Sequence, residues 1–228
     1  MDSYDLGFWN NIMYPIAPSQ VCQSWRSISL SLPHLWAYLS IEASIVELLE
    51  SFLRCFDVVL HCSCGAPLSI SIYHIPPIHL SFEAVAHILA VHSTRWWTLH
   101  IISDWPFLML FRNIKHHLPI LKQVYLGFHH GTKTGVIDIF QDAPQLEQVF
   151  LYGPMITDIS LPWLQIKTFI NSNSLVCNGK LNYPIMSESS IIDLRVLNIT
   201  HQDLLAFWPE WTLQYLKTLY LGCMSKGE

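Results

Sequence analysis

Leu121-Lys122-Gln123-Val124-Tyr125-Leu126 and Leu146-Glu147-Gln148-Val149-Phe150-Leu151 share one pattern, in which apolar residues stand at the first, fourth and sixth places. Four L-x-x-L-x-L copies and two looser ones begin at positions 96, 121, 146, 166, 194 and 216, so the steps between them are 25, 25, 20, 28 and 22 residues. The alternation within each copy predicts a short strand with one buried face. One strand with its return segment cannot bury its own apolar face, so the copies are predicted to stack into a parallel sheet.

This motif and its period are typical of leucine-rich repeats. The predicted fold class is α/β, an irregular leucine-rich-repeat solenoid over residues 42–228 with parallel strands and helical or loop returns. A capping box at Ser44 to Glu47 and a second cap at Ser81 predict two helix starts ahead of the repeats. The register of the repeat can begin at Leu68, which gives six or seven strands. Helices are predicted at 45–56, 82–89, 107–114 and 204–208, and an early strand at 67–72.

The residues between the apolar strand positions are predicted to point to the concave face. A ladder of large side chains there would form an apolar surface of the kind that marks a binding site for a protein partner. The alternative is that aromatic residues simply suit strands and are partly covered by loops. The predicted partner-binding residues are His100, Gln123, Tyr125, Gln148, Phe150, Ile170, Asn198 and Tyr220.

A second motif lies near the N-terminus, where Val21-Cys22-Gln23-Ser24-Trp25-Arg26 is followed by Leu32-Pro33-His34-Leu35-Trp36. A helix from Ser19 to Leu30 would carry one apolar stripe. Pro33 would end it, so that Leu35 and Trp36 fold back as a second short helical turn over the same core. The alternative interpretation is that the two tryptophans only fill a hydrophobic core. The stripe consists of Val21, Cys22, Trp25, Ile28 and Ser29.

This order and spacing resembles the second half of an F-box in the form common in large fungal families, where a V-C-x-x-W-R helix leads into L-P-x-L-W. Leu161-Pro162-Trp163 resembles the same lead-in. The usual first helix of the family is missing from the lead-in at residues 1–18, so the resemblance covers a partial F-box-like segment at 19–41. It implies docking on a Skp-type adaptor of a cullin-type ubiquitin ligase, with a protein substrate on the repeat arc. The implied adaptor-binding residues are Val21, Cys22, Trp25, Arg26, Leu35 and Trp36.

Composition excludes several classes of function. The chain has 228 residues, 51% hydrophobic and 13% charged, so it can bury a sizeable core. A net charge of −5 with 12 scattered Lys and Arg gives no surface for nucleic acid. The uncharged stretch at 58–82 contains Gly65 and three prolines, which argues against a membrane span, and no secretory signal begins the chain. The predicted compartment is cytoplasm or nucleus.

No catalytic constellation stands out. The chain contains no G-x-S-x-G, no H-E-x-x-H and, with 9 glycines, no phosphate-cradling loop, so we expect neither an enzyme nor a cofactor. His61-Cys62-Ser63-Cys64 is the densest cluster of metal-ligand types, but a single spacer between the thiols is too short for a usual zinc site. The cysteines are therefore expected to be small buried hydrophobes, and no metal is predicted.

A rival interpretation is a non-catalytic leucine-rich-repeat scaffold for protein interaction, or a truncated gene product, with no link to a ligase. The missing first helix of the F-box favours this alternative. So does the end of the sequence shortly after the last predicted strand, without a polar capping repeat.

Overall fold

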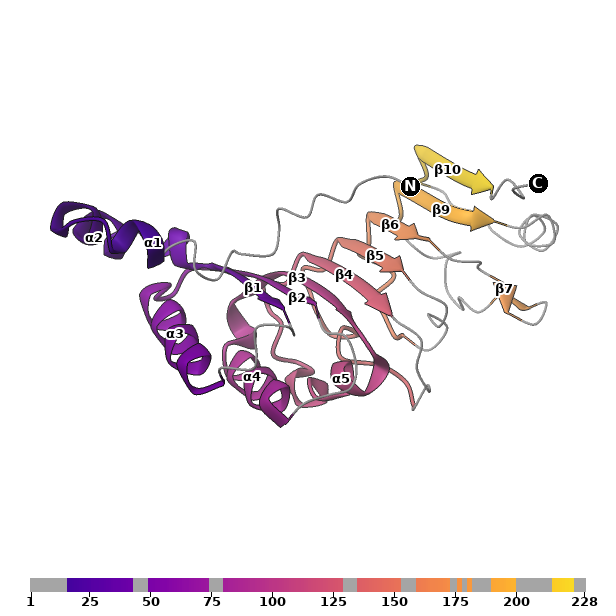
Figure 1. Ribbon diagram of the computed structural model, residues 1–228. Helices are drawn as coiled ribbons and strands as arrows, with labels where there is room; N and C mark the ends of the chain where they lie inside the picture. Colours follow the sequence, from indigo (N-terminus) through magenta and orange to yellow (C-terminus); the bar gives the residue numbers. More distant parts are fainter. Residues whose placement is uncertain are drawn as a thin grey trace, which may run out of the picture.

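In the computed structural model, the described residues are 16–42, 49–73, 80–128, 135–152, 159–172, 176–177, 180–181, 190–199 and 215–223. Within these ranges, eight strands form one all-parallel sheet whose order follows the chain, with free edges at the first and last strands (Figure 1). The α/β class and the parallel sheet are therefore confirmed. The strands are β1 (Tyr38–Glu42), β2 (Leu68–Tyr73), β3 (Trp96–Ser103), β4 (Gln123–Phe128), β5 (Gln148–Tyr152), β6 (Thr168–Asn171), β9 (Asp193–Ile199) and β10 (Thr218–Cys223).

The connections between the early strands carry helices, which lie along one side of the sheet in Figure 1. The described parts of the later connections include turns, and Ile137 and Ile159 form a short parallel bridge there. An antiparallel pair, β7 (Val176–Cys177) with β8 (Lys180–Leu181), follows β6. The helices between strands are α3 (Leu49–Cys62), α4 (Leu80–Val91), η5 (Ser93–Arg95), α5 (Trp105–Met109) and η6 (Arg112–Ile114). Ahead of β1 stand α1 (Ile16–Ser19), α2 (Gln23–Leu30) and η3 (Pro33–Trp36).

The parallel pairing aligns the fourth motif position of every copy into one row across the sheet. Seven of its members are at most 2% exposed, and the eighth, Leu219 on the edge strand β10, is 49% exposed. Burial of this apolar row contributes to the hydrophobic core that stabilises the sheet. The row consists of Leu39, Ile70, Leu99, Val124, Val149, Phe169, Leu194 and Leu219.

One predicted copy of the motif is out of register. Leu194 pairs with both Phe169 and Leu219, so it occupies the fourth position rather than the first. Ile191, which is fully buried, takes the first position. The copy therefore begins three residues earlier than predicted, and the steps from 166 to 191 and from 191 to 216 are both 25 residues.

The first strand of the sheet was missed as a copy of the motif. Trp36-Ala37-Tyr38-Leu39-Ser40-Ile41 matches Trp96-Trp97-Thr98-Leu99-His100-Ile101 position by position, and β1 pairs in parallel with β2. The predicted boundary between the F-box-like segment, which ends at residue 41, and the repeat region, which begins at residue 42, consequently falls inside β1. The last part of the F-box-like segment is therefore also the first strand of the sheet.

Some of the predicted helices and strands are confirmed, and others differ in their bounds. The strand near 67–72 and the helix that ends near residue 56 are present, although α3 extends to Cys62. α4 begins at Leu80, which places Ser81 inside the helix rather than at its cap. The face predicted at 107–114 is divided between α5 and η6. Asp104 caps the start of α5 by accepting a hydrogen bond from the Phe107 N–H at 3.0 Å. The capping box at 44–47 and the helix at 204–208 lie outside the described residues.

Two adjacent tryptophans on β3 test this register. Trp96 is fully buried and packs edge-on against Phe111, whereas Trp97 is 36% exposed and lies under the Lys122 ammonium at 4.4 Å. We expect Trp96→Ala to lower the free energy of unfolding by about 3–5 kcal/mol, because it leaves a cavity in the core. Trp97→Ala should cost less than about 1 kcal/mol. Urea denaturation measures both, and equal losses would contradict the register.

Candidate functional site

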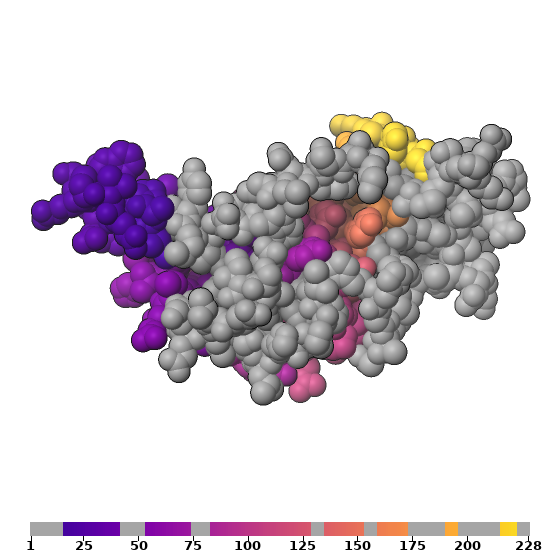
Figure 2. All heavy atoms as spheres, in the orientation of Figure 1, coloured from indigo at the N-terminus to yellow at the C-terminus, as the bar shows by residue number. Residues whose placement is uncertain are grey.

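An exposed apolar surface lies on the helical segment at the N-terminal end of the sheet. Figure 2 shows this segment, in indigo, as a lobe that projects from one end of the molecule. Besides Leu30, which is 50% exposed, five large apolar side chains on it are between 47% and 67% exposed. We call this set the α2 surface, and it consists of Val21, Trp25, Ile28, Leu32 and Leu35.

The α2 surface is exposed because α2 contributes little to the core. Ser29 is the one residue of this helix that is buried. Its carbonyl oxygen accepts a 2.7 Å hydrogen bond from the indole N–H of Trp36, which is 2% exposed. A buried hydrogen bond of this kind fixes the angle at which α2 leaves the sheet. The helix is thus anchored at one point, while its apolar stripe is left in solvent.

The predicted helix at 19–30 is divided. α1 ends at Ser19, and Cys22 adopts an extended conformation (φ −157°, ψ 173°) as the N-cap of α2. Val21 therefore precedes the helix and does not lie within it. The turn between the two helices is closed by backbone hydrogen bonds from Gln20 to Ala17 and from Val21 to Pro18.

The predicted adaptor-binding residues fall into two groups. Val21, Cys22, Trp25, Arg26 and Leu35 are all exposed, and the Arg26 Nε donates a 2.9 Å hydrogen bond to the Ser19 carbonyl. Trp36 is buried, so the interpretation as a core-filling tryptophan holds for Trp36 but not for Trp25. Trp36 positions the surface and does not form part of it.

The second candidate surface is a row of side chains that runs across the strands on the face opposite the buried row. Pairing in the sheet aligns His100 with Tyr125, Tyr125 with Phe150, and Phe150 with Ile170. The ring centroids of His100 and Tyr125 are 4.2 Å apart and those of Tyr125 and Phe150 are 6.1 Å apart, edge-on and stacked respectively. All four side chains are half-buried. Aromatic contacts of this kind stabilise a sheet by about 0.5–1.5 kcal/mol each.

The continuation of this row differs from the prediction. Arg195, and not Asn198, pairs with both Ile170 and Tyr220. Sequence reasoning missed Arg195 because the copy was placed three residues late, although a charged residue between Leu194 and Val196 marks the polar face of a strand. The Arg195 guanidinium is held by the Asp193 carboxylate at 3.0 Å, and this contact raises the pKa of Arg195.

The predicted glutamines form part of a parallel row. Gln123 pairs with Gln148, and the row continues through Thr98 and Thr168 on the neighbouring strands. Gln148 is exposed and Gln123 is half-buried. Side-chain amides beside an aromatic row can exchange hydrogen bonds with a polypeptide backbone. The strand face therefore offers apolar contacts with polar groups next to them.

His100 is the titratable group in the aromatic row. Its Nδ1 lies 3.5 Å from the Ser71 hydroxyl, and its Nε2 is buried without a hydrogen-bond partner. Burial lowers the pKa of His100, so the neutral imidazole is favoured in the folded chain. A neutral ring packed edge-on against Tyr125 serves as an apolar member of the row.

The His61–Cys64 cluster lies at the C-terminal end of α3. Burial raises the pKa of the Cys62 thiol, and the nearby Cys64 raises it further. Among the described residues, no three His, Cys, Asp or Glu side chains come together as a possible metal site. Within the same part of the chain, no helix has the length and apolar character needed to cross a bilayer.

Comparisons with family models, with curated proteins and with solved structures gave no match to this chain.

The lowered pKa of His100 predicts a pH dependence of stability. The folded chain binds fewer protons at this site than the unfolded chain, whose histidine has a pKa of about 6.5. The stability that the neutral His100 contributes is fully present above a pH of about 6.5. It is lost as the pH falls through the lower pKa that His100 has in the folded chain. We therefore expect the stability advantage of the wild type over His100→Gln to shrink between about pH 8 and about pH 5.5. Urea denaturation of both proteins measures this, and a constant difference would contradict the assignment.

Proposed function

We propose that this protein is an F-box-like substrate-recognition subunit of a cullin-type ubiquitin ligase. The helical segment docks a Skp-type adaptor through the α2 surface, and the strand face holds a protein substrate. One observation carries the proposal: four apolar residues of the stretch that resembles the F-box motif, Val21, Trp25, Leu32 and Leu35, are exposed. Trp25 at 55% exposure and Val21 at 67% are its most distinctive members.

Exposed apolar side chains gathered on one short segment of the chain favour a docking function. Single exposed apolar residues are ordinary, but contiguous ones typically mark a surface that a partner covers. Burial of a side chain such as Trp25 or Ile28 contributes about 1.5–3 kcal/mol each, part of which offsets the cost of association. Large aromatic residues are also the most frequent hot spots of protein interfaces.

The architecture supports the substrate-binding half of the proposal. Four of the five steps between copies from residue 96 onward are 25 residues long, and these steps, together with parallel strands in chain order, support a leucine-rich-repeat-like solenoid. The row through His100, Tyr125 and Phe150 then lies on its strand face. The protein itself transfers nothing. It raises the effective concentration of substrate lysines near the conjugating enzyme, in the cytoplasm or the nucleus.

A second candidate function is a non-catalytic scaffold without a ligase partner. The aromatic row favours it, because this surface needs nothing from α2 to bind a polypeptide. The two candidates differ in whether the α2 surface binds an adaptor.

Adaptor binding is tested with a purified fungal Skp-type adaptor and isothermal titration calorimetry. We expect the wild type to bind and Trp25→Ala to weaken the affinity by about tenfold or more, which is the typical loss at an aromatic hot spot. Trp97→Ala removes an exposed tryptophan from the strands and should bind as the wild type does. Circular dichroism checks that each variant is folded. No binding by the wild type, or equal losses in both variants, would refute the adaptor-docking proposal and leave the scaffold.

A further inference from the structure

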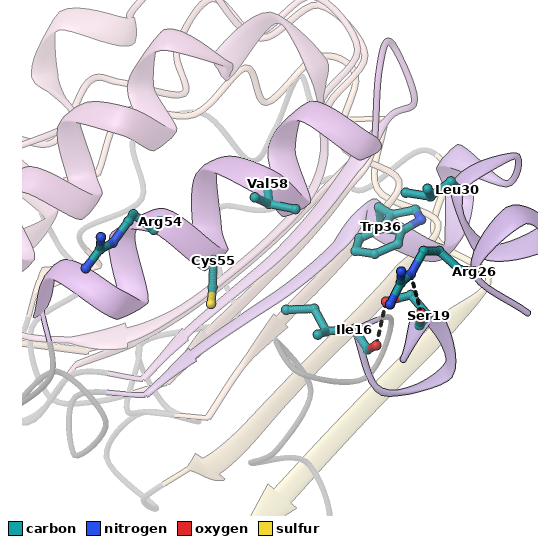
Figure 3. A pocket seen from close by; sticks show the side chains of 8 residues that line it. All are labelled: Ile16, Ser19, Arg26, Leu30, Trp36, Arg54, Cys55 and Val58. Carbon is teal, nitrogen blue, oxygen red and sulfur yellow. Dashed lines mark hydrogen bonds between the residues drawn. The ribbon is translucent and has the colours of Figure 1, made fainter. Parts of the chain in front are cut away.

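A cleft of about 340 Å³ separates the N-terminal helices from α3. Figure 3 shows α3 on one side of it, and α1, α2 and η3 on the other. This volume is at the lower end of the range for binding pockets, roughly 300–1,000 Å³. The walls are mostly apolar, and the side chains that form them are Ile16, Leu30, Trp36, Cys55 and Val58.

The cleft is cationic at its ends. Arg26 of α2 and Arg54 of α3 both line it, and among the described residues that line it none is acidic. Residues 16–41 contain no Asp or Glu at all, although the whole chain carries a net charge of −5. An apolar cleft lined by arginine side chains is complementary to an apolar side chain that has a carboxylate next to it.

One face of α3 is exposed where it borders the cleft. Val58 is 50% exposed, whereas Phe56, Val59 and Leu60 of the same helix are at most 3% exposed. Arg54 and Val58 are four residues apart on α3. In Figure 3 the Val58 side chain points toward the side of the cleft that α2 and η3 form, and not into the core. The exposed apolar character of Val58 has no role in the packing of the sheet.

We propose that the partner that covers the α2 surface also inserts an acidic segment with an apolar anchor residue into this cleft. The docking surface then extends beyond the F-box-like segment onto α3. A protein partner fits better than a small molecule, because the cleft is open and α2, which carries Trp25 and Ile28 of the α2 surface, also forms part of its wall. The proposal rests on the proposed function, since it concerns the same Skp-type adaptor.

The free thiol of Cys55 reports on the cleft directly. Cys55 is half-buried in its wall, whereas Cys64 is exposed beyond the end of α3 and does not line it. We expect saturating Skp-type adaptor to suppress alkylation of Cys55 by iodoacetamide and to leave alkylation of Cys64 unchanged. Peptide mass spectrometry of the full chain, with and without the adaptor, measures both cysteines in the same sample.

Matched variants test the apolar wall of the cleft and its two arginines separately. Val58→Asp places a carboxylate where an apolar anchor would pack, and should weaken adaptor affinity by about tenfold. Its control is Val91→Asp at a 79% exposed position on α4, which should bind normally. Arg26→Glu with Arg54→Glu should weaken binding and reduce its sensitivity to salt, whereas Arg112→Glu on η6 should do neither.

The outcomes separate this proposal from the one on which it rests. If the wild type does not bind the adaptor, the proposed function fails and the cleft assignment fails with it. If Trp25→Ala loses binding while Val58→Asp binds normally and Cys55 stays reactive in the complex, the docking surface ends at α2 and the cleft proposal alone is overturned. Suppressed Cys55 alkylation together with weak binding by Val58→Asp and by the double arginine variant supports it.

Discussion

Parallel pairing of the strands in one register determines which side chains the molecule buries and which it presents. Successive residues of a strand point to opposite faces, so a slip of one residue would exchange the row through Leu99, Val124 and Val149 for the row through His100, Tyr125 and Phe150. The first row is buried and the second half-buried, so such a slip would expose the core residues and bury the neighbouring amides. The same register that stabilises the sheet therefore also creates the aromatic row.

Trp36 connects this sheet to the α2 surface. Its ring fills the first motif position ahead of β1, and its indole N–H binds the backbone of Ser29, the buried residue of α2. One side chain thus continues the core of the sheet and fixes the helix that projects from it. Because α2 is held at this point, its apolar stripe does not collapse onto the sheet. The cleft between α2 and α3 is a consequence of the same geometry.

Much of the fold can be predicted from the sequence, because the motif positions are occupied by apolar residues at a nearly constant period. The failures have local causes. Ile191-Ile192-Asp193-Leu194 and Leu194-Arg195-Val196-Leu197 both fit the motif, and only pairing with the flanking strands distinguishes them. Trp36 was assigned to the F-box-like helical motif, so its position as the first residue of a copy of the strand motif was not recognised. The role of α3 in the cleft was not predicted, since the sequence does not show how the helix is placed against α2.

Hydrogen exchange of the full chain, followed by mass spectrometry with and without a Skp-type adaptor, tests the account most directly. A rigid sheet with a projecting docking helix predicts slow exchange across β2 to β6 in both samples, because these amides are paired on both sides. It also predicts that the adaptor slows exchange in α2 and α3 and leaves β3 to β5 unchanged. Slowing confined to the strands, with α2 and α3 unaffected, would contradict the account and assign partner binding to the strand face alone.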